Sequence, residues 1–449
     1  MNKSQNTGPA FLLVAILALG GFAAAPAWVL GASPELDRLI SALSAWSESS
    51  ADFMLDYTPM GFGYVSQQRD CARSIDRRLT FEGQRVWEAL VYFDTGTVKR
   101  IELSIYNRGD SGTLDQPAFQ RLRKILSDGL SRWSGNAGNA VEEATKDRAN
   151  SVTRKHTWIK APIAAQLSWA YAEPRRQNGE NMPFKAEFIK VALMRVSGDM
   201  QVVRDSTTVD WMPGAGTLTI KKHVRKSDTG DVWIEGLPMV DQGKKGYCAA
   251  ASSERLLRYY GRSVDQHQVA QLADTAAKEG TAQSGMIKAL ETVGQRFALD
   301  LKALIGLDWR RVAHLTEDYN RAAKAAGKPE VEIGPVIDVT FIYSEMDAAL
   351  LRKIKVKQAQ EMAQFKKYVK TYTADGVPLI WSCIVGKFPE VPPINPPGAY
   401  GHIRLIIGYN DKTGELLYTD TWGPGHELKR LPFEDAWAMT LALHVRKQK

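Results

Sequence analysis

Strand-like segments in this 449-residue chain follow one another across short polar turns, so neighbouring strands can pair only in antiparallel sheets. In the first half, residues 87–105 hold two strand patterns around the turn Asp94–Thr97. In the second half, residues 402–421 hold two more around Asn410–Gly414. Helical patterns precede these strands instead of alternating with them, which predicts a segregated α+β fold.

The length leaves room for two or three domains, and the sequence changes character at three places. We expect a targeting segment (1–32), an N-terminal α+β domain without assignable chemistry (33–225), a charged linker (226–236) and a second α+β domain (237–449). In the second domain the helices are expected to pack on an antiparallel sheet. The sequence says nothing about the oligomeric state.

Periodicity predicts the main elements of both domains. In the first domain we expect helical structure over 34–60, a helix that ends near Gly135, and strands over 156–172 and 186–196. In the second we expect helices over 247–260, 264–280, 285–294 and 344–372, and strands over 331–342, 377–385, 402–409 and 415–421.

The first 32 residues predict export. Lys3 precedes the apolar run Phe11–Phe22, and cleavage sites of the A-x-A type end at Ala27 and Ala32. The stretch 11–31 is also long enough for an uncleaved membrane anchor, but a proline and an alanine-rich second half favour cleavage. We therefore expect a secreted or periplasmic protein, with membrane attachment possible only through this segment.

Composition argues against several other functions. The 58 basic and 50 acidic side chains occur in short mixed runs, which favours a solvated surface over a nucleic-acid-binding face. The histidines lack metal-ligand spacing, so we expect neither a metal nor another cofactor. The three cysteines, Cys71, Cys248 and Cys383, allow one disulfide at most. An exported chain with this odd number keeps at least one free thiol, either buried and inert or catalytic.

Cys248 lies at the predicted start of a helix that closes at Gly261, in the position of a left-handed cap. The helix dipole and free backbone N–H groups at such a position favour the thiolate. The N–H of Cys248 and the side chain of Gln242, six residues earlier, can together form an oxyanion hole. A buried structural cysteine on an alanine-rich helix is the alternative.

His402 opens an apolar strand, and Asp420 ends the next one. Folding the hairpin about a five-residue loop brings the two side chains together diagonally on one face. Such a carboxylate fixes the imidazole tautomer and leaves the other ring nitrogen for a thiol, and Trp422 can cover the pair. A core histidine and a turn-capping carboxylate are the alternatives; together with Cys248 we interpret the pair as catalytic.

Three motifs, Gln242-x5-Cys248, Gly401-His402 and Asp420-Thr-Trp-Gly, resemble the papain-like cysteine peptidases. The chain is most similar, over about residues 230–449, to the bacterial double-glycine (bacteriocin-leader) peptidase group. The resemblance implies a papain-like fold with Cys248 as nucleophile, His402 as base and acid, Asp420 as the orienting carboxylate and Gln242 as oxyanion donor. Trp422, Gly401 and Tyr247 are expected to bind substrate or shield the site.

The sequence departs from this group in two ways. Asp420-Thr421 stands where leader peptidases commonly have Asp-Pro, and the chain has no phosphate loop or transporter spans. Cleavage of double-glycine leaders is therefore not expected. We expect an exported cysteine peptidase that cleaves amide bonds in peptides or proteins through a thioester. An inactive papain-like binding protein and a related acyltransferase or peptidoglycan amidase remain open.

Overall fold

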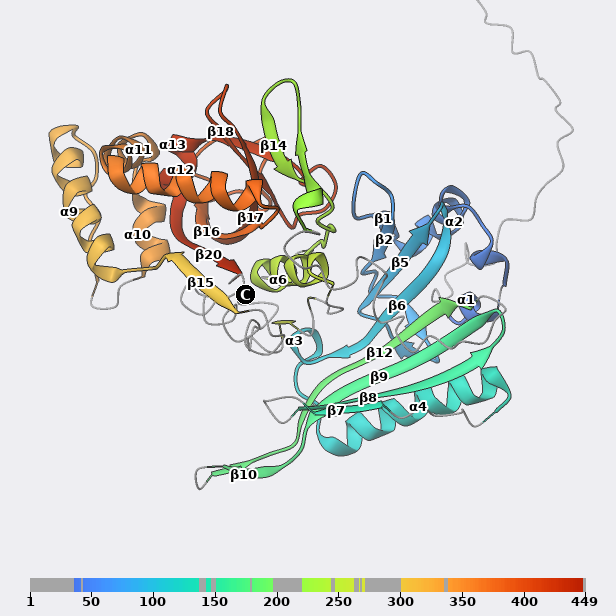
Figure 1. Ribbon diagram of the computed structural model, residues 1–449. Coiled ribbons are helices and arrows are strands. Elements are labelled where there is room, and N and C mark those ends of the chain that lie inside the picture. Colours follow the sequence, from blue (N-terminus) through green and yellow to red (C-terminus); the bar gives the residue numbers. More distant parts are fainter. Residues whose placement is uncertain are drawn as a thin grey trace, which may run out of the picture.

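A computed structural model describes residues 36–41, 43–136, 143–146, 151–177, 180–196, 220–243, 247–261, 266, 269–270, 300–334 and 338–446. The targeting segment (1–32) and the expected helix over 285–294 lie outside these residues, as does most of the helix expected over 264–280. The described chain forms two bodies of helices and antiparallel sheet that lie side by side (Figure 1). The predicted α+β class is confirmed.

The N-terminal domain is built on one eight-stranded antiparallel sheet. Its strands follow the order β1-β2-β5-β6-β12-β9-β8-β7. They are β1 (Gly63–Tyr64), β2 (Cys71–Ser74), β5 (Glu88–Asp94), β6 (Thr97–Asn107), β7 (Glu143–Lys146), β8 (Ser151–Lys160), β9 (Ile163–Ala172) and β12 (Lys185–Arg195). The predicted strand over 156–172 is in fact two, β8 and β9, because a turn at Ala161-Pro162 reverses the chain.

Helix α4 (Gln116–Ser134) packs on this sheet against β8, β9 and β12. It begins where the Asp115 carboxylate accepts the N–H of Ala118, and it ends at Gly135, whose φ of 76° suits glycine. Smaller elements complete the domain: α1 (Arg38–Ser41), α2 (Ser50–Tyr57), α3 (Arg108–Ser111) and the hairpins β3 (Thr80–Phe81) with β4 (Gln84–Arg85) and β10 (Arg175–Gln177) with β11 (Glu180–Met182).

The two faces of this sheet differ in polarity. Along β5, Ala89, Val91 and Phe93 belong to the apolar core of the domain. Because side chains alternate along a strand, Glu88 and Tyr92 point to the opposite face, which lies against the second domain. This second face is polar and becomes important below.

The C-terminal domain contains a second antiparallel sheet, in the order β13-β14-β17-β16-β20-β15, with β18 and β19 continuing from β17. Its strands are β13 (Val224–Lys226), β14 (Asp231–Ile234), β15 (Leu301–Ile305), β16 (Leu379–Val385), β17 (Tyr400–Asn410), β18 (Glu415–Thr419), β19 (Lys429–Pro432) and β20 (Thr440–Arg446). Its helices are α6 (Cys248–Tyr259), α9 (Trp309–Ala325), α10 (Val339–Glu345), α11 (Ala348–Lys357), α12 (Ala359–Ala374) and α13 (Phe433–Met439). Helices α6 and α12 pack on β17.

Two predicted elements of this domain are wrong. Residues 331–342 were expected to form a strand because of their branched apolar side chains, but α10 begins at Val339, where the Asp338 carboxylate accepts the N–H of Phe341. The long helix expected over 344–372 is broken into α11 and α12. Asp347 caps the start of α11, and Gln358, with ψ of 63°, interrupts the helical backbone between the two.

Residues 226–236, expected to be a linker, include strand β14. This strand pairs with both β13 and β17, so the segment is part of the C-terminal sheet. Gly408 allows the close approach, since a Cβ at that position would lie 2.3 Å from the carbonyl oxygen of Val232.

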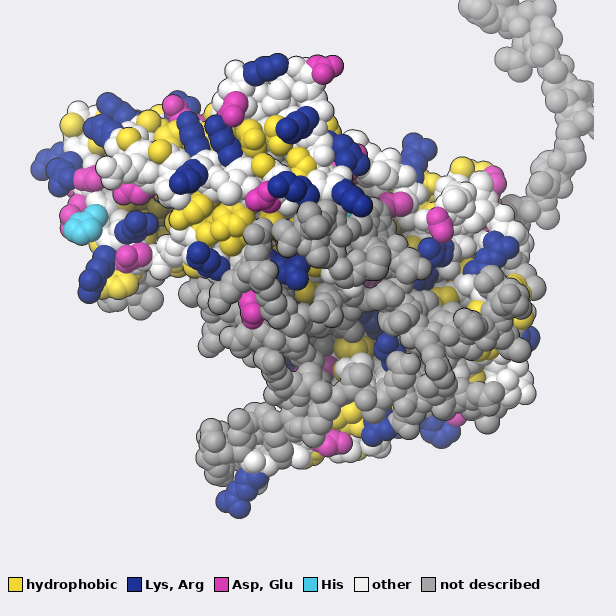
Figure 2. Space-filling model, in the orientation of Figure 1, with side chains coloured by type: hydrophobic (Ala, Val, Ile, Leu, Met, Phe, Trp, Pro, Cys, Tyr) yellow, Lys and Arg dark blue, Asp and Glu magenta, His cyan; other side chains and the backbone are white. Residues whose placement is uncertain are grey.

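The described residues include no helix with the length and apolar character required to cross a membrane. On the face seen in Figure 2, Lys and Arg side chains lie scattered among acidic ones instead of gathering in one basic surface.

Candidate active site

Cys248 is the first residue of α6 and is buried against the sheet. The three alanines that follow it are strong helix formers, and they are small enough to let the helix pack closely on β17. Ser252, one turn along, donates its hydroxyl to the carbonyl of Ile403 at 3.1 Å. This bond fixes the start of α6 beside the residue that follows His402.

His402 and Asp420 are joined by a hydrogen bond of 2.6 Å between Nε2 and Oδ1. Both side chains are buried, on β17 and just beyond the end of β18. On its other side the His402 ring is hydrogen-bonded to Cys248. Since Nε2 faces Asp420, the nitrogen available to the thiol is Nδ1.

A β-bulge brings His402 and Asp420 to the same face of the hairpin. The loop between β17 and β18 has four residues, 411–414, and not the five predicted. With this loop alone the two side chains would lie on opposite faces. The register shifts by one residue between Ile406 and Gly408, however, and the bulge restores the diagonal pairing.

A buried ionic cluster lies behind the carboxylate of Asp420. Arg404 Nε lies 2.9 Å from Asp420 Oδ2, and its two terminal nitrogens bind Glu390 at 3.0 and 2.8 Å. Lys429 and the Tyr418 hydroxyl also bind Glu390, at 2.8 and 2.7 Å. We call Asp420, Arg404, Glu390, Lys429 and Tyr418 the Arg404 cluster. Sequence analysis missed it, although an arginine in the otherwise apolar run of β17 was a usable signal.

Neighbouring charges in the site shift the pKa values of His402, Cys248 and Asp420 toward their charged forms. Burial alone lowers the pKa of His402, but the neighbouring Asp420 carboxylate outweighs it and raises the pKa to about 9. Burial likewise raises the pKa of Cys248, yet the hydrogen bond and positive charge of His402 bring it below its usual value. Burial raises the pKa of Asp420 too, and Arg404 and His402 outweigh this to hold it well below its usual range. These shifts favour a thiolate–imidazolium pair over the neutral thiol and imidazole.

The other two cysteines differ sharply from Cys248. Burial raises the pKa of both Cys71 and Cys383 far above the ordinary value for a thiol. Cys383 lies next to His402 in the β16–β17 ladder but is fully buried in the core. In the part of the chain that the structure describes, all three cysteines are free thiols.

Trp422 lies flat on the His402 ring, with ring centroids 4.4 Å apart and an angle of 9° between the planes. It covers the ring where water would otherwise compete for the His402–Asp420 hydrogen bond. Gly401 precedes His402 on β17, opposite Ile384. Tyr247 caps α6 and is completely buried, which fits shielding better than contact with substrate.

Gln242 lies beside the loop that carries Asp420. Its N–H donates to the Thr421 carbonyl at 2.9 Å, and its Oε1 accepts the Thr421 hydroxyl at 2.5 Å. Because Oε1 is held in this way, the amide is oriented and Nε2 is its donor end. The structure thus brings Cys248, His402, Asp420, Trp422 and Gln242 together at one end of the β17–β18 hairpin, with Gly401 and Tyr247 as the chain neighbours of His402 and Cys248.

A cysteine at the head of a helix, packed on an antiparallel sheet that carries the histidine, is the arrangement of the papain-like cysteine hydrolases. Comparison with family models identifies the domain further: residues 234–443 match the Peptidase_C39 like family. The match covers slightly less than half of the chain and supports a C39-like family of papain-like cysteine peptidases for this part. The comparison with curated proteins gave no match.

Among the described residues, no three His, Cys, Asp or Glu side chains lie close enough together to hold a metal ion.

Proposed function

We propose that the C-terminal domain hydrolyses amide bonds through Cys248, His402 and Asp420. The observation that carries this proposal is that His402 is hydrogen-bonded to Cys248 on one side and to Asp420, at 2.6 Å, on the other. Consecutive hydrogen bonds thus join a nucleophile, a base and an orienting carboxylate. The lowered pKa of Cys248 and the raised pKa of His402 give the protonation states that such a reaction needs.

In the first half of the reaction, the Cys248 thiolate attacks the carbonyl carbon of the substrate. The electron pair of the C=O bond moves to oxygen, and the N–H of Cys248 and the amide of Gln242 hold the resulting oxyanion. When the intermediate collapses, the C–N bond breaks and His402 gives its proton to the departing amine. A thioester on Cys248 remains.

In the second half, neutral His402 takes a proton from water, and the hydroxide formed attacks the thioester carbon. The C–S bond then breaks, the carboxylic acid leaves, and Cys248 returns to a thiolate beside protonated His402. Asp420 stays ionised throughout and stabilises the imidazolium. Arg404 holds Asp420 in place as a positioning residue.

Thiol alkylation across pH tests this proposal. Wild-type protein should show one iodoacetamide-reactive thiol below pH ~7, because His402 stabilises the thiolate, and Cys248→Ala should lose it. In His402→Ala, Cys248 should react only as the pH approaches the ordinary thiol pKa of about 8.5. Peptide hydrolysis should decline as the pH rises through about 9, where His402 loses its proton.

Ordinary reactivity of Cys248 near pH ~8.5 in the wild-type protein would contradict the ion pair. A decline of hydrolysis near pH ~6.5 would mean an unperturbed histidine. Assays with a peptide library and with peptidoglycan stem peptides, run in parallel, separate a peptidase from an envelope amidase.

We also propose that the protein is exported. The support is the apolar run Phe11–Phe22 with small residues after it, in a segment outside the described residues. Cell fractionation with N-terminal sequencing is expected to find a mature chain that starts after Ala27 or Ala32 in the envelope or medium. Recovery of the intact chain from the cytoplasm would refute export, and an intact chain in the membrane would indicate an anchor.

A further inference from the structure

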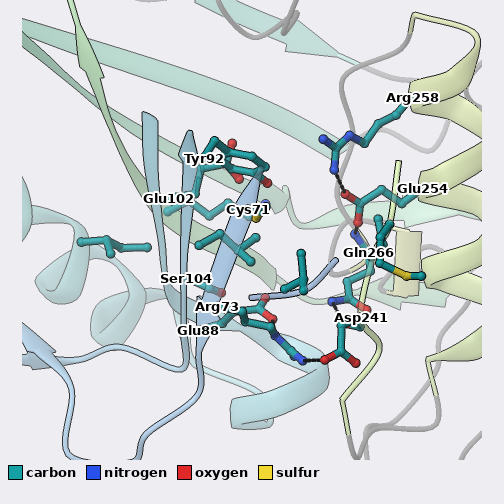
Figure 3. Close-up of a pocket in the computed structure, with 16 residues that line it drawn as sticks. Cys71, Arg73, Glu88, Tyr92, Glu102, Ser104, Asp241, Glu254, Arg258 and Gln266 are labelled. Atoms are coloured by element: carbon teal, nitrogen blue, oxygen red, sulfur yellow. Dashed lines mark hydrogen bonds and ion pairs between the residues drawn. The ribbon is translucent and has the colours of Figure 1, made fainter. Parts of the chain in front are cut away.

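The polar face of the N-terminal sheet packs against the helix that carries Cys248. A small cavity of about 30 Å³ lies between the two, lined on one side by strands β2, β5, β6 and β12 and on the other by α6 and residues 239–241 (Figure 3). Most of the side chains around it are charged or polar. They include Arg73, Glu88, Tyr92, Asp241, Glu254 and Arg258.

Arg73 forms a direct ionic link between the two domains in this cavity. Its Nε lies 2.5 Å from Glu88 Oε1 in its own domain, and its Nη1 lies 3.4 Å from Asp241 Oδ2 in the other (Figure 3). Arg73 and Glu88 are buried, so solvent screens their pair little, whereas the Asp241 side chain is 26% exposed. A guanidinium in such a place is held by its carboxylates and in turn fixes them.

Asp241 connects Arg73 to the candidate oxyanion donor. Asp241 Oδ1 accepts the N–H of Gly243 at 2.7 Å, so its carboxylate shapes the turn around Gln242. Gln242 exchanges two hydrogen bonds with Thr421, whose own N–H donates to Asp420 Oδ1 at 3.0 Å. A continuous series of contacts therefore runs from Arg73 to the carboxylate that holds His402.

A second contact reaches the other end of the same loop. The N–H of Gln67 in the N-terminal domain donates to Glu427 Oε1 at 2.7 Å, and Glu427 Oε2 accepts the N–H of Gly425 at 2.7 Å. The loop is closed by the bond from the Asp420 N–H to the His426 carbonyl at 2.9 Å. The N-terminal domain thus contacts both the turn at Gln242 and the loop 420–427.

The third contact is with α6 itself. Arg258 lies over the ring of Tyr92, 5.7 Å from its centre, and binds Glu254 at 3.1 Å. Glu254 Oε2 accepts the N–H of Gln266, whose side chain donates to the Asp241 carbonyl at 3.0 Å (Figure 3). The helix of Cys248 and the turn of Gln242 are therefore tied together on the surface that the N-terminal sheet covers.

We propose that the N-terminal domain positions the catalytic groups, with Arg73 acting through Asp241 to hold Gln242 and the loop 420–427 in the reactive arrangement. Arg73 is a positioning residue, and its role rests on the function proposed above. The N-terminal domain is accordingly a permanent part of the enzyme. Its removal would lower activity, whereas removal of an inhibitory pro-domain would raise it.

The test compares Arg73→Gln with Arg73→Lys and with Lys99→Gln, which breaks the exposed Lys99–Asp94 pair of the same domain. In Arg73→Gln we expect kcat to fall by about tenfold with KM unchanged, less than the ~10²–10³ lost when an oxyanion donor is removed. Arg73→Lys should recover part of the loss, and Lys99→Gln should behave as wild type. The pH profile of Cys248 alkylation should stay unchanged, since the His402–Cys248 contact is untouched.

Amide hydrogen exchange gives a readout that needs no substrate. Exchange at Gln242, Gly243 and Asp420 should be faster in Arg73→Gln than in wild type, because the turn and loop are less constrained. Arg73→Gln also removes the buried Arg73–Glu88 ion pair and can fail to fold. Asp241→Asn avoids this, because it keeps the Oδ1 acceptor for Gly243 and the Arg73–Glu88 pair, and it should show the same changes.

Unchanged kcat and unchanged exchange in a folded Asp241→Asn variant would overturn the positioning role. Faster exchange with unchanged kcat would overturn it as well, since the contact would then order the loop without affecting the reaction. A wild-type protein that cleaves no peptide and has no reactive Cys248 would refute the proposed function instead.

Discussion

Cys248→Ala is expected to abolish peptide hydrolysis, with kcat falling by at least ~10⁴-fold, because loss of a nucleophile leaves only binding and oxyanion stabilisation. No other thiol can replace it. Burial raises the pKa of both Cys71 and Cys383, and neither is hydrogen-bonded to His402. The variant removes only a sulfur atom from a site next to three alanines, so the fold should persist.

Steady-state hydrolysis of a peptide substrate measures the effect, with circular dichroism and thermal unfolding to verify the fold. Cys71→Ala is the matched control, because it removes a buried thiol that has no partner in the reaction. It should retain activity. Substantial hydrolysis by Cys248→Ala would mean that the reaction does not pass through this thiol, and the thioester mechanism would then have to be abandoned.

Arg404→Met is expected to lower the free energy of unfolding by about 3–5 kcal/mol, the usual cost of removing one partner from a buried ion pair. Arg404 is fully buried and serves two carboxylates, Asp420 and Glu390. Without it, Glu390 keeps only Lys429 and the Tyr418 hydroxyl, and Asp420 Oδ2 loses its cation. Methionine fills a similar volume, so the loss reports on charge more than on packing.

Arg430→Met is the matched control for this experiment. Arg430 also grips a carboxylate with two nitrogens, binding Asp231 at 2.8 and 2.6 Å, but its side chain is 39% exposed. The free energy of unfolding should fall by less than about 1 kcal/mol in this variant. Denaturant unfolding followed by tryptophan fluorescence gives both values. An equal loss of unfolding free energy in the two variants would show that burial does not make the ion pairs of Arg404 more stabilising than the exposed pair of Arg430.

Local sequence patterns predicted much of the candidate site. The start of α6 at Cys248 follows from the run of alanines behind it, and the hairpin of β17 and β18 follows from its turn residues. The family resemblance over the C-terminal half is confirmed by the match to residues 234–443. These features depend on residues close together in sequence, where periodicity and turn chemistry are informative.

Contacts between distant segments were missed for a physical reason. The bulge at Ile407 moves Asp420 to the face of His402, and the one signal beside it, Gly408, fits a close backbone approach equally well. Glu390 meets Arg404 across 14 residues, and Arg73 meets Asp241 across the domain boundary. In the sequence, Glu390, Arg73 and Asp241 look like ordinary surface charges, and only Arg404, in its apolar run, signals burial.

Two short segments were assigned the wrong structure because their sequences carry signals for two different structures. Around α10, branched apolar residues favoured a strand, yet the Asp338 cap and packing against α9 favoured a helix. In residues 226–236, charged side chains suggested a linker, although Asp231, Val232 and Trp233 pair as a strand with β17. The secondary structure of such short segments depends on the distant segments with which they pair or pack. A single sequence does not reveal those partners.

The position of β20 has a consequence for synthesis of the chain. This strand, Thr440–Arg446, lies inside the sheet between β16 and β15. Its neighbour β16 pairs on its other edge with β17, the strand that bears His402. Until residues 440–446 have been synthesised, the sheet lacks this interior strand, and β15 lacks the neighbour with which it pairs in the described structure. Completion of the sheet that carries His402 therefore has to await synthesis of these residues.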